Sequence, residues 1–271
     1  MLKTRLITAL VLAPIVVIAT IVLPTTWYAV AWGVVFAIAA WEWSDLCGMS
    51  KPAARLGLVL AIIAAMTLAP LWANWALDWI SWPVVAWWFV LSLLIRRAPN
   101  KLLKLNYPLG VKLAIGFLVL ITSWIHLVWL HWNFHAMQVL YLLLLIWLAD
   151  GSAYFVGKNW GFAKLAPEIS PGKTVEGMYG SLFASALFAL TVGLFKQFDL
   201  IMIVDFVLIS LLTVVVSVVG DLFESLIKRI RGVKDSGALL PGHGGILDRI
   251  DSILAAAPLF YLGSYMRDIF L

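Results

Sequence analysis

The sequence predicts an all-α polytopic integral membrane protein with about nine transmembrane helices. Of its 271 residues, 63% are hydrophobic and only 12% are charged, whereas soluble proteins are about 25% charged. Apolar runs of roughly 20 residues, the length of helix that crosses a bilayer, recur along the whole chain. These runs do not alternate in short segments of about ten residues, as the strands of a transmembrane barrel do.

The apolar runs give the predicted spans in order. The first follows Lys3 and Arg5 with the charge pattern of a signal peptide, but no clear cleavage site ends it, so we expect it to be retained. Pro24, Pro70 and Pro108 fall at predicted turns, where a missing backbone donor is harmless. The spans are predicted near residues 6–23, 27–44, 54–70, 77–95, 110–130, 136–156, 177–196, 200–225 and 251–270.

Positive charge is unevenly distributed over the predicted loops. All but two of the 19 Lys and Arg residues fall in one set of loops, the exceptions being Lys196 and Arg267. Because cytoplasmic loops are enriched in Lys and Arg, this set predicts a cytoplasmic N-terminus and an outside C-terminus. The expected membrane is a bacterial inner membrane. Topology and anionic lipid headgroups account for the net charge of +5, so no nucleic acid is expected as a partner.

No repeat or linker divides the chain, so residues 1–271 are predicted to form a single membrane domain. Residues 1–135 contain spans without a recognisable motif. Residues 136–271 contain the charged motifs and form the predicted catalytic half.

Acidic residues gather at the predicted cytoplasmic ends of the last two spans. The spacing i, i+3, i+4, i+7 puts one group on a single helix face, and a second pair three residues apart opens the next span. Carboxylates presented to one point from two helices suit Mg²⁺, which takes one or two of them with waters and phosphates. Structural ion pairs with neighbouring Lys and Arg explain the spacing equally well. The residues are Asp221, Glu224, Ser225 and Lys228, then Asp248 and Asp251.

Two loops rich in glycine and lysine lie next to these acids. Gly244 and Gly245 allow the backbone to approach a phosphate closely. His243 lies between Gly242 and Gly244. It can donate to a phosphate or a leaving group, or it is an ordinary loop histidine. The upstream loop contains the P-loop ending Gly-Lys-Thr, but the remainder of that motif and its strand are missing. Its Thr174 is predicted to cap the next helix.

Two long patterns cover residues 150–177 and 225–251. The first consists of Asp150, Ala153-Tyr154, Gly157-Lys158, Gly161, Ser170-Pro171, Lys173-Thr174 and Glu176-Gly177. The second consists of Ser225, Lys228-Arg229, Lys234-Asp235, Gly237, Pro241, His243-Gly244-Gly245, Asp248-Arg249 and Asp251. Together they resemble the phosphatidate cytidylyltransferases, also called CDP-diacylglycerol synthases. The resemblance spans about a hundred residues, and its downstream pattern is highly specific.

The resemblance implies an activity and a set of partners. The family makes CDP-diacylglycerol and pyrophosphate from CTP and phosphatidic acid, in the bilayer, with Mg²⁺, a second monovalent cation such as K⁺, and homodimers. It implies that Asp221 and Asp248, with Asp251, are metal ligands. The other implied catalytic residues are Lys228, Arg229 and His243, and the implied substrate-binding residues are Ser170, Lys173, Thr174, Glu176, Ser225, Lys234, Asp235, Gly244, Gly245 and Arg249.

Two other classes of function remain as alternatives. A CTP-dependent polyprenol kinase resembles the upstream pattern, and it would transfer the γ-phosphoryl group and release CDP instead of pyrophosphate. A membrane transporter would place ionisable residues at mid-membrane on several spans. The CDP-alcohol phosphatidyltransferases are excluded, because Asp150-Gly151 is not followed by their Ala-Arg signature.

Overall fold

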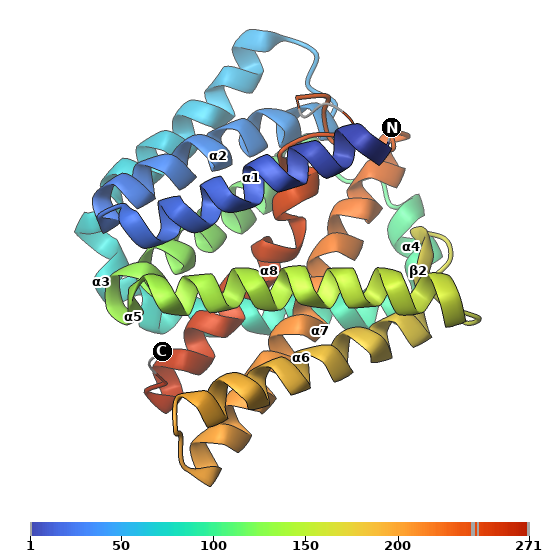
Figure 1. The fold of residues 1–271 in the computed structure, drawn as a ribbon. Coiled ribbons are helices and arrows are strands. Elements are labelled where there is room, and N and C mark those ends of the chain that lie inside the picture. The colour runs from blue at the N-terminus through green and yellow to red at the C-terminus, as the bar shows by residue number, and fades with distance from the viewer. Residues whose placement is uncertain (1, 240–241, 243, 270–271) are drawn as a thin grey trace.

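The computed structural model describes residues 2–239, 242 and 244–269, and this part of the chain forms eight helices and one two-stranded sheet (Figure 1). Helices therefore dominate the fold, as the apolar runs predict. The elements are α1 (Leu2–Val22), α2 (Thr25–Leu46), α3 (Pro52–Arg97), α4 (Pro99–Lys104), α5 (Leu109–Trp160), β1 (Lys164–Ala166), β2 (Ser170–Thr174), α6 (Val175–Phe195), α7 (Leu200–Arg231) and α8 (Leu247–Arg267).

Within the described residues, five helices, α2, α3, α5, α6 and α7, are long and apolar enough to cross a membrane. Large apolar side chains such as Leu71, Trp79 and Phe183 are exposed on their outer faces. An aqueous protein rarely exposes contiguous apolar surface of this kind, whereas a bilayer covers it. The protein is therefore an all-α membrane protein.

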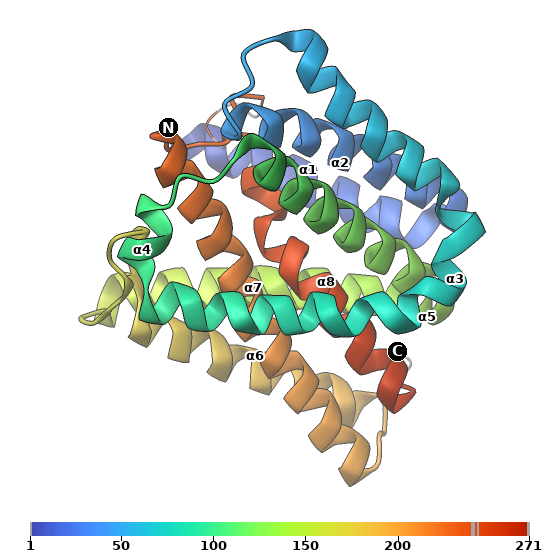
Figure 2. The same ribbon diagram turned by 180° about the vertical axis from the view of Figure 1, so that it is seen from behind.

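Two helices are about twice as long as a span, and each contains two of the predicted spans. Figure 2 shows α3 folding back on itself, and α5 doing the same. In α5 the change of direction coincides with His135, whose φ of 68° is not helical. Pro70 and Pro83 lie inside α3, so Pro70 is within a helix and not in a turn between two helices. A proline there removes a backbone hydrogen bond and permits a kink.

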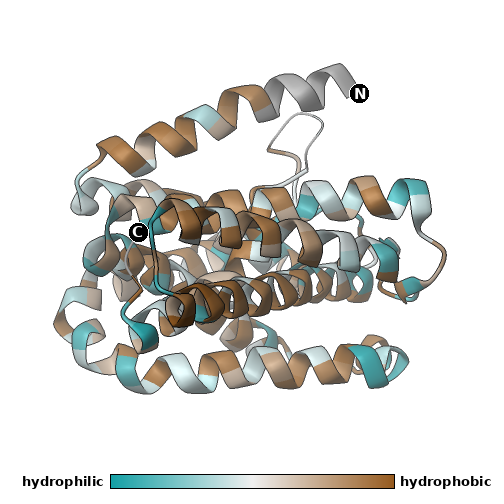
Figure 3. Ribbon diagram, turned by 60° about the horizontal axis from the view of Figure 1, so that its bottom comes forward, coloured by the Kyte–Doolittle hydropathy of each residue, from teal (hydrophilic) through white to brown (hydrophobic). Residues whose placement is uncertain are grey.

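The last helix, α8, occupies the middle of the bundle. The views from both sides place α8 between the returning legs of α3 and α5 (Figures 1 and 2), and nearly every residue from Ser252 to Leu262 is buried. Hydrophobic residues fill the middle of the central helices, and hydrophilic residues gather towards helix ends and connections (Figure 3). Where α7 ends and α8 begins, Glu224 and Asp248 are buried, whereas Arg229, Arg231 and Arg249 are exposed.

A short hairpin, absent from the sequence prediction, connects α5 to α6. Its strands β1 and β2 are antiparallel, with Lys164 opposite Thr174 and Ala166 opposite Ser170. Ser170 and Pro171 of the upstream pattern belong to β2. The helix begins at Val175, and the Thr174 hydroxyl accepts a hydrogen bond from the Gly177 amide at 3.1 Å. The predicted cap is thus confirmed, and it is the last residue of β2.

Candidate active site

The cytoplasmic end predicted for α7 carries the charged face that the sequence spacing indicates. Ser225 Oγ donates to Asp221 Oδ1 at 3.3 Å, one turn away. Lys228 Nζ donates to Glu224 Oε2 at 2.7 Å, also one turn away. Gly232 ends the helix in a left-handed conformation with φ of 76°. The four side chains therefore share one helix face, as predicted.

Helix α8 contacts α7 closely enough to add a further carboxylate. A Cβ on Gly220 would overlap the backbone carbonyl of Asp251, so the two backbones touch at this point. The Asp251 carboxyl has the carboxyls of Asp221, Glu224 and Asp150 as electrostatic neighbours. We call these four residues, Asp150, Asp221, Glu224 and Asp251, the acidic cluster.

Two lysines partly neutralise this region. Lys173 Nζ lies 2.7 Å from Asp221 Oδ2 and connects the β1–β2 hairpin to α7. Lys228 Nζ lies between Glu224 Oε2, at 2.7 Å, and Asp248 Oδ1, at 2.6 Å. Glu224 Oε1 is buried and has no hydrogen-bond partner within the described part of the chain. Carboxylates outnumber these ammonium groups, so the region has capacity for additional cations.

Asp248 differs from the acidic cluster because one of its oxygens accepts three hydrogen bonds from the loop between α7 and α8. Its Oδ2 accepts hydrogen bonds from Ser236 N at 2.9 Å, Ser236 Oγ at 3.0 Å and Gly245 N at 2.8 Å. Burial opposes ionisation, but the hydrogen bonds from Lys228, Gly245 and Ser236 outweigh it and lower the pKa of Asp248. Asp248 is therefore an anion that holds the loop between α7 and α8.

Sequence reasoning missed a second carboxylate that holds the same loop. Glu42, in α2, is only 6% exposed. Its Oε1 accepts from Ile246 N at 3.0 Å, and its Oε2 accepts from Leu247 N at 2.8 Å and Ser236 Oγ at 3.0 Å. The signal was available, because Glu42 is a lone carboxylate in an apolar predicted span. We call Glu42 and Asp248 the loop-holding pair.

The glycines predicted to contact phosphate lie against this pair of carboxylates in the structure. Gly244 has φ of 79°, and a Cβ there would lie 2.5 Å from Asp248 Oδ2. The Gly245 amide already donates to Asp248. In the structure the loop amides thus bind anions, as glycine-rich turns do, and these anions are the protein's own carboxylates.

The remaining predicted site residues contact the hairpin segment or are exposed. Arg229 Nε donates to Ile169 O at 3.1 Å, which adds a second connection between α7 and the hairpin segment. Glu176 accepts from the amides of Phe162 and Ala163 at 3.0 to 3.2 Å, so it organises the turn before β1. Of the other predicted site residues, Ser170 is partly buried in β2, and Lys234, Asp235 and Arg249 are exposed. His243 lies outside the described residues.

A metal ion is compatible with the donors present, although no three His, Cys, Asp or Glu side chains of the described residues form a ready-made metal site. Mg²⁺ usually takes one or two protein carboxylates and completes its shell with water and phosphate oxygens. Glu224 Oε1, buried without a partner, and the clustered acids around Asp251 supply hard oxygen donors of that kind. The residues therefore fit Mg²⁺.

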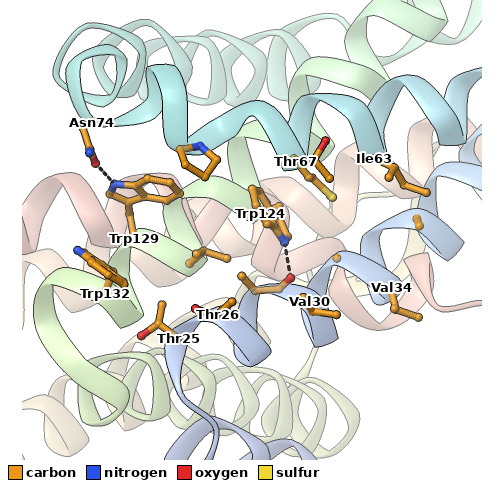
Figure 4. A pocket seen from close by; sticks show the side chains of 16 residues that line it. Thr25, Thr26, Val30, Val34, Ile63, Thr67, Asn74, Trp124, Trp129 and Trp132 are labelled. Carbon is orange, nitrogen blue, oxygen red and sulfur yellow. Dashed lines mark hydrogen bonds between the residues drawn. The ribbon is translucent and has the colours of Figure 1, made fainter.

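A separate cavity of about 600 Å³ lies between α2, α3 and α5 (Figure 4). Its lining is mostly apolar, with Val30, Val34 and Ile63 along its length. Trp129 Nε1 donates to Asn74 Oδ1 at 2.8 Å towards one end of it (Figure 4). No residue of the acidic cluster or of the loop-holding pair lines this cavity, so it is distinct from the charged site.

The chain resembles known proteins over nearly its whole length. The model of the cytidylyltransferase family matches residues 3–266. The phosphatidate cytidylyltransferase of Pseudomonas aeruginosa is 39% identical over 263 residues, 96% of each chain. That of Haemophilus influenzae is 35% identical over 283 residues, covering 96% of this chain and 97% of the relative. The chain therefore belongs to the cytidylyltransferase family, among its phosphatidate cytidylyltransferases.

Proposed function

We propose that the protein transfers the cytidylyl group of CTP to phosphatidic acid, giving CDP-diacylglycerol and pyrophosphate for phospholipid biosynthesis. The observation that carries the proposal is the junction of α7, α8 and the hairpin, where Lys173 meets Asp221 and Lys228 meets Asp248. This junction offers both lysines for phosphates and carboxylates for a cation. Phosphatidic acid reaches it from the bilayer, since the surrounding helices are those of a membrane protein.

The reaction requires electrostatic help more than a base. The second pKa of a phosphomonoester is about 6, so phosphatidic acid is already nucleophilic at neutral pH. One of its phosphate oxygens attacks the α-phosphorus of CTP, and the bond from that phosphorus to the oxygen of the β-phosphate breaks. The electron pair leaves on pyrophosphate. Lysine and arginine clamps stabilise such transition states. We assign Lys173, Lys228, Arg229 and Lys234 to the phosphates, and His243 to the leaving group.

We assign the cations to the carboxylates of the same junction. Asp221, Asp248 and Asp251 are the proposed Mg²⁺ ligands, with a monovalent cation such as K⁺ as second ion. Bound Mg²⁺ supplies neutralisation of the phosphate charge. Asp248 Oδ1 is paired with Lys228, so on nucleotide binding we expect this lysine to transfer from Asp248 to a phosphate and release that oxygen.

The proposed arrangement in the membrane has nine spans, with the N-terminus cytoplasmic, the C-terminus outside and the site at the cytoplasmic face of a bacterial inner membrane. The folded-back α3 and α5 support this count, because each provides two legs (Figure 2). The distribution of Lys and Arg supports the orientation, because only Lys196 and Arg267 of the 19 fall on the predicted outer side. We propose one domain over residues 1–271, with residues 136–271 catalytic and a homodimer as the assembly.

The direct test uses the purified full chain, phosphatidic acid and labelled CTP, with and without Mg²⁺. We expect CDP-diacylglycerol and pyrophosphate in equal amounts, and only with the metal. Release of CDP and phosphorylation of the lipid acceptor would instead identify a kinase. Vesicle uptake of a solute without CTP turnover would identify a transporter.

A further inference from the structure

Glu42 lies in the half of the chain without motifs, yet it contacts the loop of the candidate active site. We infer that Glu42 is a positioning residue: through Ser236 and the first turn of α8, it determines where Asp248 and Asp251 stand. The inference rests on the proposed function, because the effect on turnover concerns that reaction. It assigns a role in catalysis to α2, which neither sequence pattern includes.

The end of α2 that carries Glu42 is held rigidly. The neighbouring Trp43 donates from Nε1 to Lys112 O at 3.0 Å, and its ring stacks on Phe223 with centroids 5.7 Å apart. A Cβ on Gly116 would overlap the Trp43 ring, so α2 and α5 are in close contact. The Glu42 carboxylate is therefore presented from a surface fixed against both α5 and α7.

Glu42 provides the cap that α8 otherwise lacks. The first amides of a helix have no partner within it, and its N-terminus favours a negative charge. In α8 the side chain of the N-cap residue Ile246 makes no capping hydrogen bond. The Glu42 carboxylate instead accepts from the amides of Ile246 and Leu247, at 3.0 and 2.8 Å, although 204 and 205 residues separate them.

Ser236 couples this cap to Asp248. The Ser236 hydroxyl lies 3.0 Å from Glu42 Oε2 and 3.0 Å from Asp248 Oδ2. It has a single proton to donate, so the two carboxylates share one donor. A change at Glu42 therefore alters the hydrogen bonding of Asp248, and with it the partner of Lys228.

The glycines of the loop fit around the Glu42 carboxylate. A Cβ on Gly237 would lie 2.6 Å from Glu42 Oε1. A Cβ on Gly245 would overlap both Glu42 Oε2 and Ser236 Oγ. The loop backbone therefore lies directly against the carboxylate, which any larger residue at these two places would prevent.

The test is Glu42→Gln in the full-length protein, with Asp45→Asn as matched control. The glutamine keeps the size of the side chain but turns one acceptor into a donor that faces an amide. Loss of one charge-assisted hydrogen bond corresponds to about a 10- to 100-fold effect. We expect kcat to fall by about that factor, the half-saturating Mg²⁺ concentration to rise, and hydrogen exchange at Leu247 to accelerate. Asp45 lies three residues further along α2 and pairs with Arg55, and its variant should retain all three properties.

A second variant separates positioning from general stability. Ser236→Ala removes the shared hydroxyl, and we expect the double variant Glu42→Gln with Ser236→Ala to lose little more activity than Glu42→Gln alone, because the two residues act as one unit. Fully additive losses would contradict the inference, as would wild-type kcat and exchange in Glu42→Gln. If Glu42→Gln fails to fold, Ser236→Ala takes its place as the test. Faster hydrogen exchange at Leu247 and a higher half-saturating Mg²⁺ concentration in Ser236→Ala would support the inference, and wild-type values of both would contradict it.

The readouts also separate this inference from the proposed function. If the wild-type protein does not convert CTP and phosphatidic acid, the proposed function is wrong. The exchange rate at Leu247 in Glu42→Gln still reports whether Glu42 holds the first turn of α8. An unchanged rate refutes the positioning role whatever the reaction is.

Discussion

The acidic cluster and the loop-holding pair are two neighbouring groups of carboxylates, and different partners stabilise their negative charge. The pair, Glu42 and Asp248, is compensated mainly by backbone amides and a shared serine hydroxyl. The cluster has two lysines, the Ser225 hydroxyl and a single backbone amide, that of Ser252, which donates to Asp251. Glu224 Oε1 has no partner among the described residues. A buried carboxylate that is hydrogen-bonded to backbone amides is fixed in position. A carboxylate that is paired with flexible lysine side chains can replace them by another cation. The difference distinguishes a pair that holds the loop from a cluster that can accept further cations.

Removal of Mg²⁺ gives the largest expected difference between the two groups. Chelation with EDTA should abolish CTP turnover, and added Mg²⁺ should restore it, because the proposed site has too few cations of its own. Amide exchange at Gly245 and Leu247 should stay slow throughout, since the loop-holding pair needs no metal for its amide contacts. The measurement is pyrophosphate release together with exchange by mass spectrometry. Fast exchange in the apo protein would show that the metal, and not Glu42, organises the loop.

Asp248→Asn should have the next largest effect, because Asp248 touches both groups. The change removes the negative charge beside Lys228 and turns one acceptor of the loop amides into a donor. Removal of one group that stabilises charge in a transition state lowers kcat by about 100- to 1000-fold, and we expect a loss of turnover of that size. Turnover is measured as labelled CDP-diacylglycerol, and folding as thermal unfolding in detergent. Near-normal turnover in the folded variant would refute the assigned role.

Gly245→Ala tests whether the position of the loop matters for activity. The new Cβ would overlap Ser236 Oγ and Glu42 Oε2, so we expect activity to fall by about tenfold or more as the loop shifts. Gly57→Ala is the control, because a Cβ on Gly57 meets nothing within 4 Å and alanine is favoured over glycine by about 0.5–1 kcal/mol in a helix. Equal activities of the two variants would mean that the loop tolerates displacement.

The smallest effect is expected at the opposite ends of α7 and α8. Arg267 and Asp205 form an ion pair there that is partly exposed, and such pairs contribute about 0–1 kcal/mol. Arg267→Ala should leave turnover within about twofold of wild type and lower the unfolding temperature only slightly. A large loss of turnover would show that the two ends of these helices are coupled, and that the charged site is less self-contained than its contacts indicate.

Local patterns in the sequence predict local structure well here. The spacing of Asp221, Glu224, Ser225 and Lys228 predicts one helix face, and the hydrogen bonds of α7 confirm it. Thr174 caps α6 as predicted, and α8 begins at Leu247, just before the acidic pair. Each of these features depends on residues at most seven positions apart, and the geometry of one helix determines such relations.

What could not be predicted depends on contacts between distant parts of the chain. Glu42 meets Ile246 across 204 positions, and nothing in the spacing of either segment encodes that meeting. The Leu247 amide likewise donates to Glu42, 205 positions away. The β1–β2 hairpin was missed because its strands are three and five residues long, too short for a periodic signal.

The separation of Glu42 from its partners also has a consequence for how the protein is made. At about 5–20 residues per second, the ribosome adds the 204 residues between Glu42 and Ile246 in roughly 10–40 s. During that interval α2 carries an acid whose backbone partners do not yet exist, at a depth where an unpaired charge is costly. The newborn helix therefore keeps this acid near the headgroups until the last helix arrives. Final assembly of the site is thus a late event of biogenesis, after most of the chain has entered the membrane.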